Sequence, residues 1–277
     1  MSWAGRRPSA AQHALVTQRI ALGLAYRGGA YHGWQSQPDG RTVQDQVERA
    51  LSSFVDAPVR VVCAGRTDTG VHAFNQVVHL DSPVQREPFS WLRGTNRYLP
   101  GDIALQWAQP VAADFHARFS AQGRRYRYLL LQSPMRPALE AGMVGWSFAA
   151  LDGAAMCEAA RHLLGEHDFS AFRSSQCQAL SPVKTLRAID ISRHGDYWRF
   201  DFDASAFLHH MVRNLMGCLV EVGAGRQPSA WLLEVLAARD RKAAAPTFAA
   251  EGLYFCGPYY DPRFAIPMTT TAMAWLP

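Results

Sequence analysis

Two spacings of apolar residues alternate in the first third of the chain, one typical of strands and one typical of helices. Residues 42–55 carry apolar side chains at helical spacing after Thr42, a candidate N-cap, and a shorter helix is expected at 88–99. Strands are expected on either side of these helices, at 19–28, 59–64, 75–82 and 102–111.

The second half of the chain repeats this plan. A strand is expected at 124–133, and two further strands form a hairpin around the turn at 194–196. Helices are expected at 151–168, at 206–225, which ends at a glycine, and at 228–241, which begins with proline and serine.

These elements form two halves of similar plan, joined near residues 110–124. The expected bounds are 18–112 for the N-terminal half and 113–265 for the C-terminal half, with an extension at 1–17 and a tail at 266–277. Because hairpins make the sheet mixed or antiparallel, the pattern predicts an α+β protein and not a doubly wound parallel sheet. We expect the sheets of the two halves to lie side by side, with a central cleft as the binding site.

The composition is that of a folded protein with a basic bias. Hydrophobic residues make up 48% and charged residues 18%, and the net charge of +5 suits a polyanionic partner. Only Lys184 and Lys242 among the 28 basic residues are lysines. Arginine binds phosphate and stacks on bases, so the bias favours nucleic acid, although codon usage in a GC-rich genome explains it equally well.

Several classes of site are not indicated. The five cysteines are widely spaced with no C-x-x-C, so we expect neither disulfides nor zinc, and a cytoplasmic location. We expect no signal peptide, and the sequence contains neither an apolar run long enough to span a membrane nor a glycine-rich nucleotide motif.

The stretch GRTDTGVHA, residues 65–73, presents Asp68 between Gly65 and Gly70 after an apolar run. Three interpretations are open. The first is a structural turn. The second is an aspartic protease, which needs a second aspartate from elsewhere, and Arg66 nearby would oppose proton sharing. The third is a lone nucleophilic carboxylate.

Two other residues are candidates to act with Asp68. Tyr126 lies in GRRYRY, where alternation places tyrosines and arginines on opposite faces of a strand, as suits base stacking; a core tyrosine is the alternative. Arg213 lies in an otherwise apolar helix, where it either pairs with a carboxylate or extends to solvent.

The histidines predict no metal site. His209 and His210 are adjacent, so on a helix they diverge by about 100° and cannot chelate one metal, which leaves packing or hydrogen bonding. Trp34 in YHGWQ is interpreted as packing, and His32 remains open between packing and a wall for the substrate.

Seven stretches in order, from about residue 19 to 264, carry a family resemblance. They are YHGWQ, GRTDTGVHA, RGTNRYLPGDI, FHARFSAQGRRYRY, HDFSAF, FLHHMVRN and EGLYF. Together they resemble the tRNA pseudouridine synthase A family. The resemblance implies the pseudouridine synthase fold and an isomerase that modifies uridines 38, 39 and 40 in the tRNA anticodon stem-loop. It also implies a homodimer that needs no cofactor.

The same resemblance implies roles for individual residues. Asp68 corresponds to the catalytic nucleophile, Tyr126 to the residue stacked on the uracil, and Arg213 to the arginine paired with the carboxylate. Arg66 corresponds to the residue that enters the RNA stack when the base flips out, and Leu253 to an apolar wall of the uracil pocket.

This chain departs from the family pattern at two positions, with Thr69 in place of alanine and Arg27 in place of aspartate. We expect these changes to affect details of RNA contact and not the reaction. A non-catalytic RNA-binding module is the alternative function, which Asp68 opposes because a pure binder of polyanions needs no carboxylate there.

Overall fold

Ten strands form one mixed sheet in the order β4-β1-β3-β10-β5-β9-β8-β7, with β2 beside β3 and β6 beside β5. The computed structural model describes residues 17–268, so nearly all of the expected extension and tail lies outside them. The strands are β1 (Gln18–Tyr26), β2 (Val62–Cys63), β3 (His72–Ser82), β4 (Ile103–Pro110), β5 (Ala121–Gln132), β6 (Gly145–Ser147), β7 (Gly165–Asp168), β8 (Val183–His194), β9 (Tyr197–Ala204) and β10 (Leu253–Tyr260).

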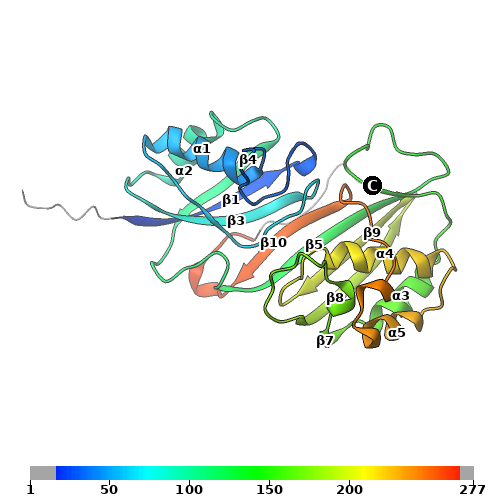
Figure 1. Ribbon diagram of the computed structural model, residues 1–277. Helices are drawn as coiled ribbons and strands as arrows, with labels where there is room; N and C mark the ends of the chain where they lie inside the picture. Colours follow the sequence, from blue (N-terminus) through cyan, green and yellow to red (C-terminus); the bar gives the residue numbers. More distant parts are fainter. Residues whose placement is uncertain (1–16, 269–277) are drawn as a thin grey trace, which may run out of the picture.

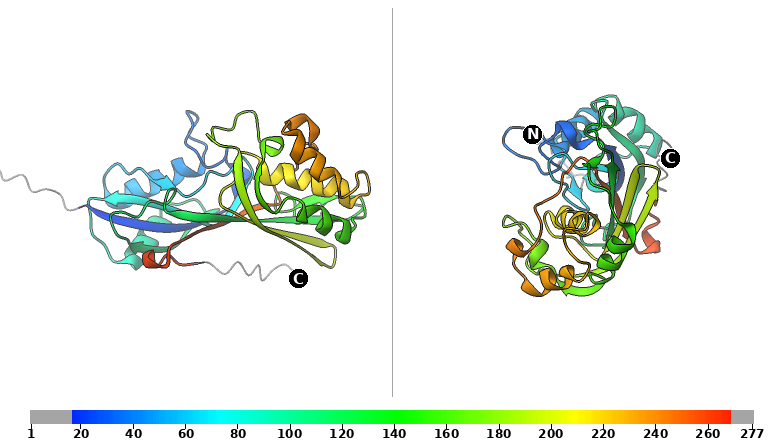
Figure 2. Two further views of the ribbon diagram at one scale, coloured as in Figure 1. Left: turned by 90° about the horizontal axis from the view of Figure 1, so that it is seen from below. Right: turned by 90° about the vertical axis from the view of Figure 1, so that its right-hand side faces the viewer.

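Helices cover the sheet in two groups, one at each end (Figure 1). They are α1 (Val43–Val55), α2 (Pro88–Asn96), α3 (Gly153–Arg161), α4 (Met211–Gly223) and α5 (Trp231–Ala238), with short 3-10 turns at Gly28–Ala30, Ser170–Phe172, Arg241–Ala243 and Pro262–Phe264. Helices α1 and α4 lie on the same side of the sheet, at opposite ends of an elongated molecule (Figure 2). No helix within residues 17–268 combines the length and the apolar character that crossing a membrane requires.

Strand β10 joins the two halves into one sheet. It pairs in parallel with β3, where Tyr254 lies opposite His72, and antiparallel with β5, where Phe255 lies opposite Tyr126. The predicted α+β class with two halves side by side is confirmed, but the spacing of apolar residues predicted no strand at 253–260. The strand is nearly all buried and apolar, so it lacks the alternation that marks a half-exposed strand.

Local sequence signals set several element ends as predicted. Thr42 caps α1 by accepting a hydrogen bond from the Asp45 amide at 3.3 Å. The β8–β9 hairpin turns through Gly195, which has a positive φ of 61°.

Four predicted helices are shorter than expected; those expected over 88–99 and 228–241 are Pro88–Asn96 and Trp231–Ala238. The helix expected over 206–225 begins only at Met211, because His210 adopts a left-handed conformation with φ 64° that a right-handed helix cannot contain. The helix expected over 151–168 ends at Arg161, and residues 165–168 form β7 instead. The strand expected over 59–64 is reduced to Val62–Cys63.

Each group of helices encloses its own apolar core on the sheet. One core includes residues of α1 and α2, and the other includes residues of α3, α4 and α5. Tyr126 on β5 contacts both cores. The junction of the two halves therefore lies at this tyrosine and the strands on either side of it.

Candidate active site

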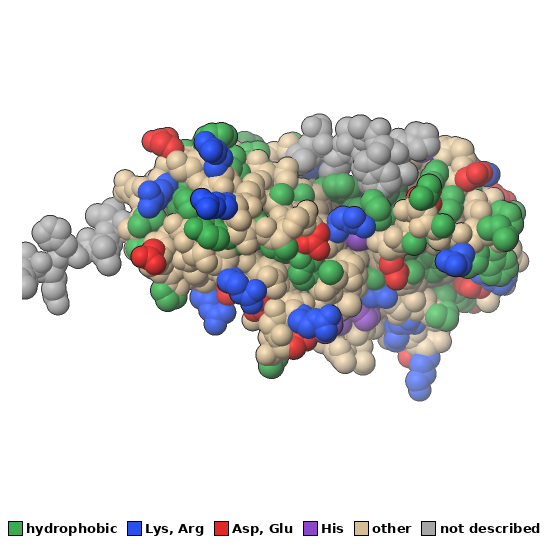
Figure 3. Space-filling view, turned by 90° about the horizontal axis from the view of Figure 1, so that it is seen from above, with side chains coloured by type: hydrophobic (Ala, Val, Ile, Leu, Met, Phe, Trp, Pro, Cys, Tyr) green, Lys and Arg blue, Asp and Glu red, His purple; other side chains and the backbone are tan. Residues whose placement is uncertain are grey.

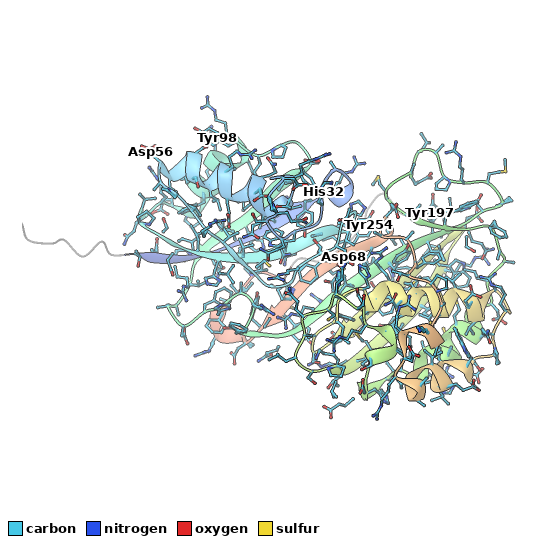
Figure 4. All side chains as sticks on the ribbon, viewed as in Figure 1. His32, Asp56, Asp68, Tyr98, Tyr197 and Tyr254 are labelled. Atoms are coloured by element: carbon cyan, nitrogen blue, oxygen red, sulfur yellow. The ribbon has the colours of Figure 1, made fainter. Side chains whose placement is uncertain are left out.

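The loop between β2 and β3 carries Asp68 to the junction of the two halves (Figure 4). The end of β1 and the loop that follows it support the Asp68 loop through side-chain and backbone contacts. The Trp34 amide donates to the Thr67 carbonyl at 2.9 Å, and the Tyr26 and Thr67 hydroxyls share a hydrogen bond of 2.8 Å. Trp34 is 1% exposed and contacts Tyr26, so the packing role predicted for it is confirmed.

Two glycines in this supporting loop allow its backbone to approach the backbone of the Asp68 loop closely. A Cβ atom on Gly28 would lie 2.0 Å from the carbonyl oxygen of Val71. A Cβ atom on Gly33, whose φ is +82°, would lie 2.7 Å from the carbonyl oxygen of Thr67. The backbone around Asp68 is therefore held by contacts that larger residues would prevent.

Three nitrogen donors from the C-terminal half face the Asp68 carboxylate. His209 Nε2 lies 3.3 Å from Oδ1, and His210 Nε2 and Arg213 Nη1 each lie 3.5 Å from Oδ2. The Asp68 side chain is only 20% exposed, so these contacts form in a partly desolvated site. Lysine or arginine side chains lie beside histidine near the middle of the molecule in Figure 3.

These donors keep Asp68 ionised despite its burial. Burial alone raises the pKa of this carboxyl, but the hydrogen bond from His209 and the charges of His210, His209 and Arg213 outweigh it. The net result is a pKa below the usual aspartate value. An ionised carboxylate has an available electron pair, which is what a nucleophile needs and what proton sharing in an aspartic protease dyad would remove.

Arg213 is fixed in place by a second contact. Its Nε donates to the Phe248 carbonyl at 2.8 Å, and its side chain is 17% exposed. It therefore lies against the carboxylate and does not extend to solvent, which decides between the two interpretations of this residue.

The prediction that His209 and His210 diverge was wrong. They precede α4 instead of lying in it, and the left-handed backbone of His210 brings the two rings to within 4.0 Å, both directed at Asp68. The adjacent Cys177 Sγ accepts from the His209 amide, and the His209 carbonyl accepts from the Ser174 amide. The signal that could have indicated this arrangement is the pair of neighbouring histidines just before a helix that has no side-chain cap.

Within residues 17–268, Asp68, His209 and His210 also form a group whose geometry could hold a metal ion. One ligand atom each from Asp68, His209 and His210 lies within 4.8 Å of the others. Arg213 opposes a metal there, because its permanent positive charge already lies against the carboxylate. The two histidines are therefore better suited to stabilise the ionised Asp68 carboxylate than to bind a cation beside it.

Tyr126, whose hydroxyl is affected by the charge of Asp68, packs among aromatic and apolar side chains. The centroid of the Tyr126 ring lies 5.1 Å from that of Phe207 and 5.0 Å from that of Phe255. Burial, and after it the charge of Asp68, raises the pKa of the Tyr126 hydroxyl. Leu253, which is 4% exposed, lies on the same face of the sheet two residues before Phe255 on β10. The structure thus brings Tyr126 and Leu253 to the side of the sheet that packs against the helices.

Arg66 is placed differently from the other candidates. It is exposed and donates through Nη1 to Gln178 Oε1 at 3.2 Å, so it spans from the Asp68 loop to the C-terminal half without pairing with Asp68. His32, left open by the sequence, contacts Asp39 Oδ2 through Nδ1 at 2.5 Å.

The two departures from the family pattern are both exposed. Within residues 17–268, the Thr69 hydroxyl makes no hydrogen bond to the Asp68 loop. The charge of Arg27 contributes to lowering the pKa of His72, for which burial is the main cause. Arg27, which stands where the family pattern has aspartate, therefore adds positive charge at the edge of the site.

Known proteins match this chain along most of its length. The sequence pattern of the family described as tRNA pseudouridine synthase matches residues 24–120 and 159–261. A protein named tRNA pseudouridine synthase A from Methylibium petroleiphilum is 70% identical over 259 residues, which cover 94% of this chain and 100% of that relative. Proteins of the same name from Polaromonas naphthalenivorans and Paracidovorax citrulli are 61% and 59% identical, with the same coverage.

A likeness to a solved structure is much weaker. One chain in "Crystal Structure of a Cbf5-Nop10-Gar1 Complex" covers 81% of this chain and 60% of its own length, at 12% identity and a TM-score of 0.35.

Proposed function

The chain belongs to the tRNA pseudouridine synthase family, whose members are isomerases that convert uridine in tRNA to pseudouridine, and we propose that Asp68 is the nucleophile of this reaction. We further propose that the target lies in the anticodon stem-loop. The observation that carries the proposal is a partly buried carboxylate held ionised by His209, His210 and Arg213. The target uridines are those at positions 38, 39 and 40, as the seven-motif resemblance implies.

The reaction breaks the N1–C1′ bond of uridine and joins C5 of the same uracil to C1′. The C5 proton leaves, N1 gains a proton, and the composition of the nucleotide does not change. Asp68 supplies the electron pair, either to C6 of the ring or to the sugar after the glycosidic bond opens. Arg213 holds the carboxylate ionised and oriented from one side throughout.

The remaining candidates serve the flipped base. A uridine must leave its stack to reach Asp68, and an aromatic and apolar wall then replaces the lost stacking. Tyr126 stacks on the uracil and Leu253 closes the pocket, a role supported by their position on the helix-covered face of the sheet. Arg66, exposed two residues before Asp68, occupies the gap left in the RNA.

The proposed domain bounds, cellular location and oligomeric state follow from the family resemblance. We assign the two halves the bounds 18–112 and 113–265, and expect a cytoplasmic homodimer with no cofactor. A basic cleft across both subunits would bind tRNA, in keeping with the net charge of +5.

The test is pseudouridine formation in unmodified tRNA, located by chemical mapping, for the wild type and Asp68→Asn. We expect the wild type alone to modify the anticodon stem-loop, while Asp68→Asn folds and still binds tRNA. Asp190→Asn, which removes an exposed carboxylate on β8, is the matched control and should retain activity. If wild type and Asp68→Asn both bind tRNA and neither modifies it, the alternative of a non-catalytic RNA-binding module is correct.

A further inference from the structure

An open polar cavity of about 470 Å³ lies against His210, one of the residues that contact the Asp68 carboxylate. Its lining combines Arg173, Arg241 and His210 with the hydroxyls of Ser170, Ser174 and Thr247. No apolar side chain lines it, so it does not suit a base or an acyl chain. Guanidinium and hydroxyl groups together are the donors that bind phosphate in proteins.

The two arginines are not neutralised by ion pairs. Within residues 17–268, neither has a carboxylate within 4 Å; Arg173 Nη2 donates to the Cys177 carbonyl at 2.9 Å, and Arg241 donates to neutral oxygens, among them Thr247 Oγ1 at 3.1 Å. The nearby Asp168 contacts Arg239 at 3.7 Å. The charge of Arg173 also helps to lower the pKa of Asp168, but among the described residues neither Arg173 nor Arg241 forms an ion pair. Two half-buried positive charges therefore face one cavity, which favours an anionic ligand.

One side chain connects the cavity to the catalytic carboxylate. His210 lines the cavity, and its Nε2 lies 3.5 Å from Asp68 Oδ2. His210 is also the N-cap of α4 and provides no side-chain cap, so the positive end of that helix lies at the same place. An anion bound in the cavity would be separated from the Asp68 carboxylate only by the side chain of His210.

We propose that this cavity binds the RNA backbone phosphate that flanks the flipped uridine. The inference rests on the proposed function, since the uracil occupies the wall formed by Tyr126 and Leu253. The phosphate held by Arg173 and Arg241 then fixes the ribose between the cavity and Asp68. The contact orients the substrate and does not read its base, because every nucleotide carries the same phosphate.

Arg173 is the better residue to change, because Arg241 also binds Asn214 and Thr247 inside the fold. We expect Arg173→Gln to raise KM for unmodified tRNA about 10-fold with little change in kcat at saturation. The slope of log affinity against log salt should fall by about one phosphate contact. Arg193→Gln, which removes an exposed arginine at the end of the β8–β9 hairpin, is the matched control and should change none of these values.

A chemical double-mutant cycle tests whether the contact is to that phosphate. An anticodon stem-loop RNA carries a neutral methylphosphonate at the phosphate 5′ or 3′ of the target uridine. At one of these positions the wild type should bind about 10-fold more weakly, and Arg173→Gln should then cause no further loss. Losses that multiply at both positions, or an Arg173→Gln variant that binds like the wild type, would overturn the proposal.

Competition by inorganic phosphate separates an RNA contact from a site for a free anion. Inorganic phosphate should weaken RNA binding by the wild type more than by Arg173→Gln; if it competes while both methylphosphonate RNAs bind normally, the cavity holds a free anion and the proposal fails. The salt, methylphosphonate and competition readouts all measure binding. They remain valid if the wild type forms no pseudouridine, which is the outcome that would refute the proposed function instead.

Discussion

The two halves of the molecule do different work on the same carboxylate. The N-terminal half holds the Asp68 backbone through tight, uncharged contacts, such as the Tyr26–Thr67 hydrogen bond and the close approach of Gly33. The C-terminal half holds the carboxylate itself through the cationic or titratable groups of His209 and Arg213. Position and ionisation of one group thus come from separate parts of the chain.

The histidines show the same division. In the N-terminal half, His72 accepts from the Gly28 amide at 3.0 Å and its Nε2–H donates to the Glu251 carbonyl at 3.0 Å, while burial lowers its pKa, so it is neutral and structural. In the C-terminal half, His209 and His210 face the Asp68 carboxylate. If the comparison is correct, changes in the N-terminal half will alter stability and changes in the C-terminal half will alter the titration of Asp68.

The largest effect is expected from Arg213→Met. Losing this cation should lower kcat by on the order of 10³-fold and raise the Asp68 pKa, since one of the charges that lowers it is gone. A carboxylate is active above its pKa, so the acidic limb of the kcat/KM profile should move to higher pH. Arg226→Met, which removes an arginine paired with Glu221 beyond the other end of α4, is the control. Wild-type turnover in Arg213→Met would remove this residue from the site.

The next largest effect concerns the supporting loop. Gly28→Ala places a methyl group 2.0 Å from the Val71 carbonyl, a backbone atom that cannot move aside alone. We expect the free energy of unfolding to fall by about 3 kcal/mol in urea titrations. Gly29→Ala is the control on the next residue, because its methyl group would meet no atom within 4 Å. Equal stability of the two variants would show that the loop is not held as tightly as described.

A pH-dependent loss of stability is expected from His79 on β3. Burial, aided by Arg19 and His116 against the opposing charge of Asp81, lowers its pKa to about 4. Between pH 6.5 and 4 the unfolded chain therefore binds a proton that the folded chain does not, so stability falls as pH falls. The expected loss is about 2 kcal/mol after allowance for solvent screening.

Urea titrations of wild type and His79→Gln at about pH 7, 5.5 and 4.5 would measure this contribution. The glutamine oxygen can still accept from the Ala117 amide, which His79 Nδ1 accepts at 3.1 Å. The variant should show a flatter pH dependence, whereas His194→Gln, at an exposed hairpin position, should match the wild type. Identical slopes for all three proteins would contradict a neutral, buried His79.

The smallest effect is expected from Tyr26→Phe. It removes one hydrogen bond to Thr67, the residue before Asp68, so about 1 kcal/mol of stability should be lost. Because the N-terminal half sets position and not charge, kcat should fall while the pH profile keeps its shape. Tyr98→Phe, at a tyrosine that is 51% exposed, is the control. A shifted acidic limb in Tyr26→Phe would break the proposed division of labour.

Local sequence rules predicted the parts of this protein that depend on near neighbours. Helical spacing and Thr42 placed α1 correctly, and alternation with a turn at Gly195 placed the β8–β9 hairpin. The two glycines around Asp68 likewise indicated a presented carboxylate from the sequence alone. These features need only residues a few positions apart, so the pattern contains the information.

Only the tertiary structure decided what surrounds that carboxylate. His209 lies 141 positions from Asp68, and it is hydrogen-bonded to Ser174 and Cys177 next to the left-handed turn at His210. Strand β10 carries no alternating pattern because nearly all of it is buried, and both of its neighbours in the sheet come from distant segments. The cavity lined by Arg173 and Arg241 likewise forms between two separate turns. Contacts of this kind are set by the free energy of burying the whole sheet, which no short stretch of sequence determines.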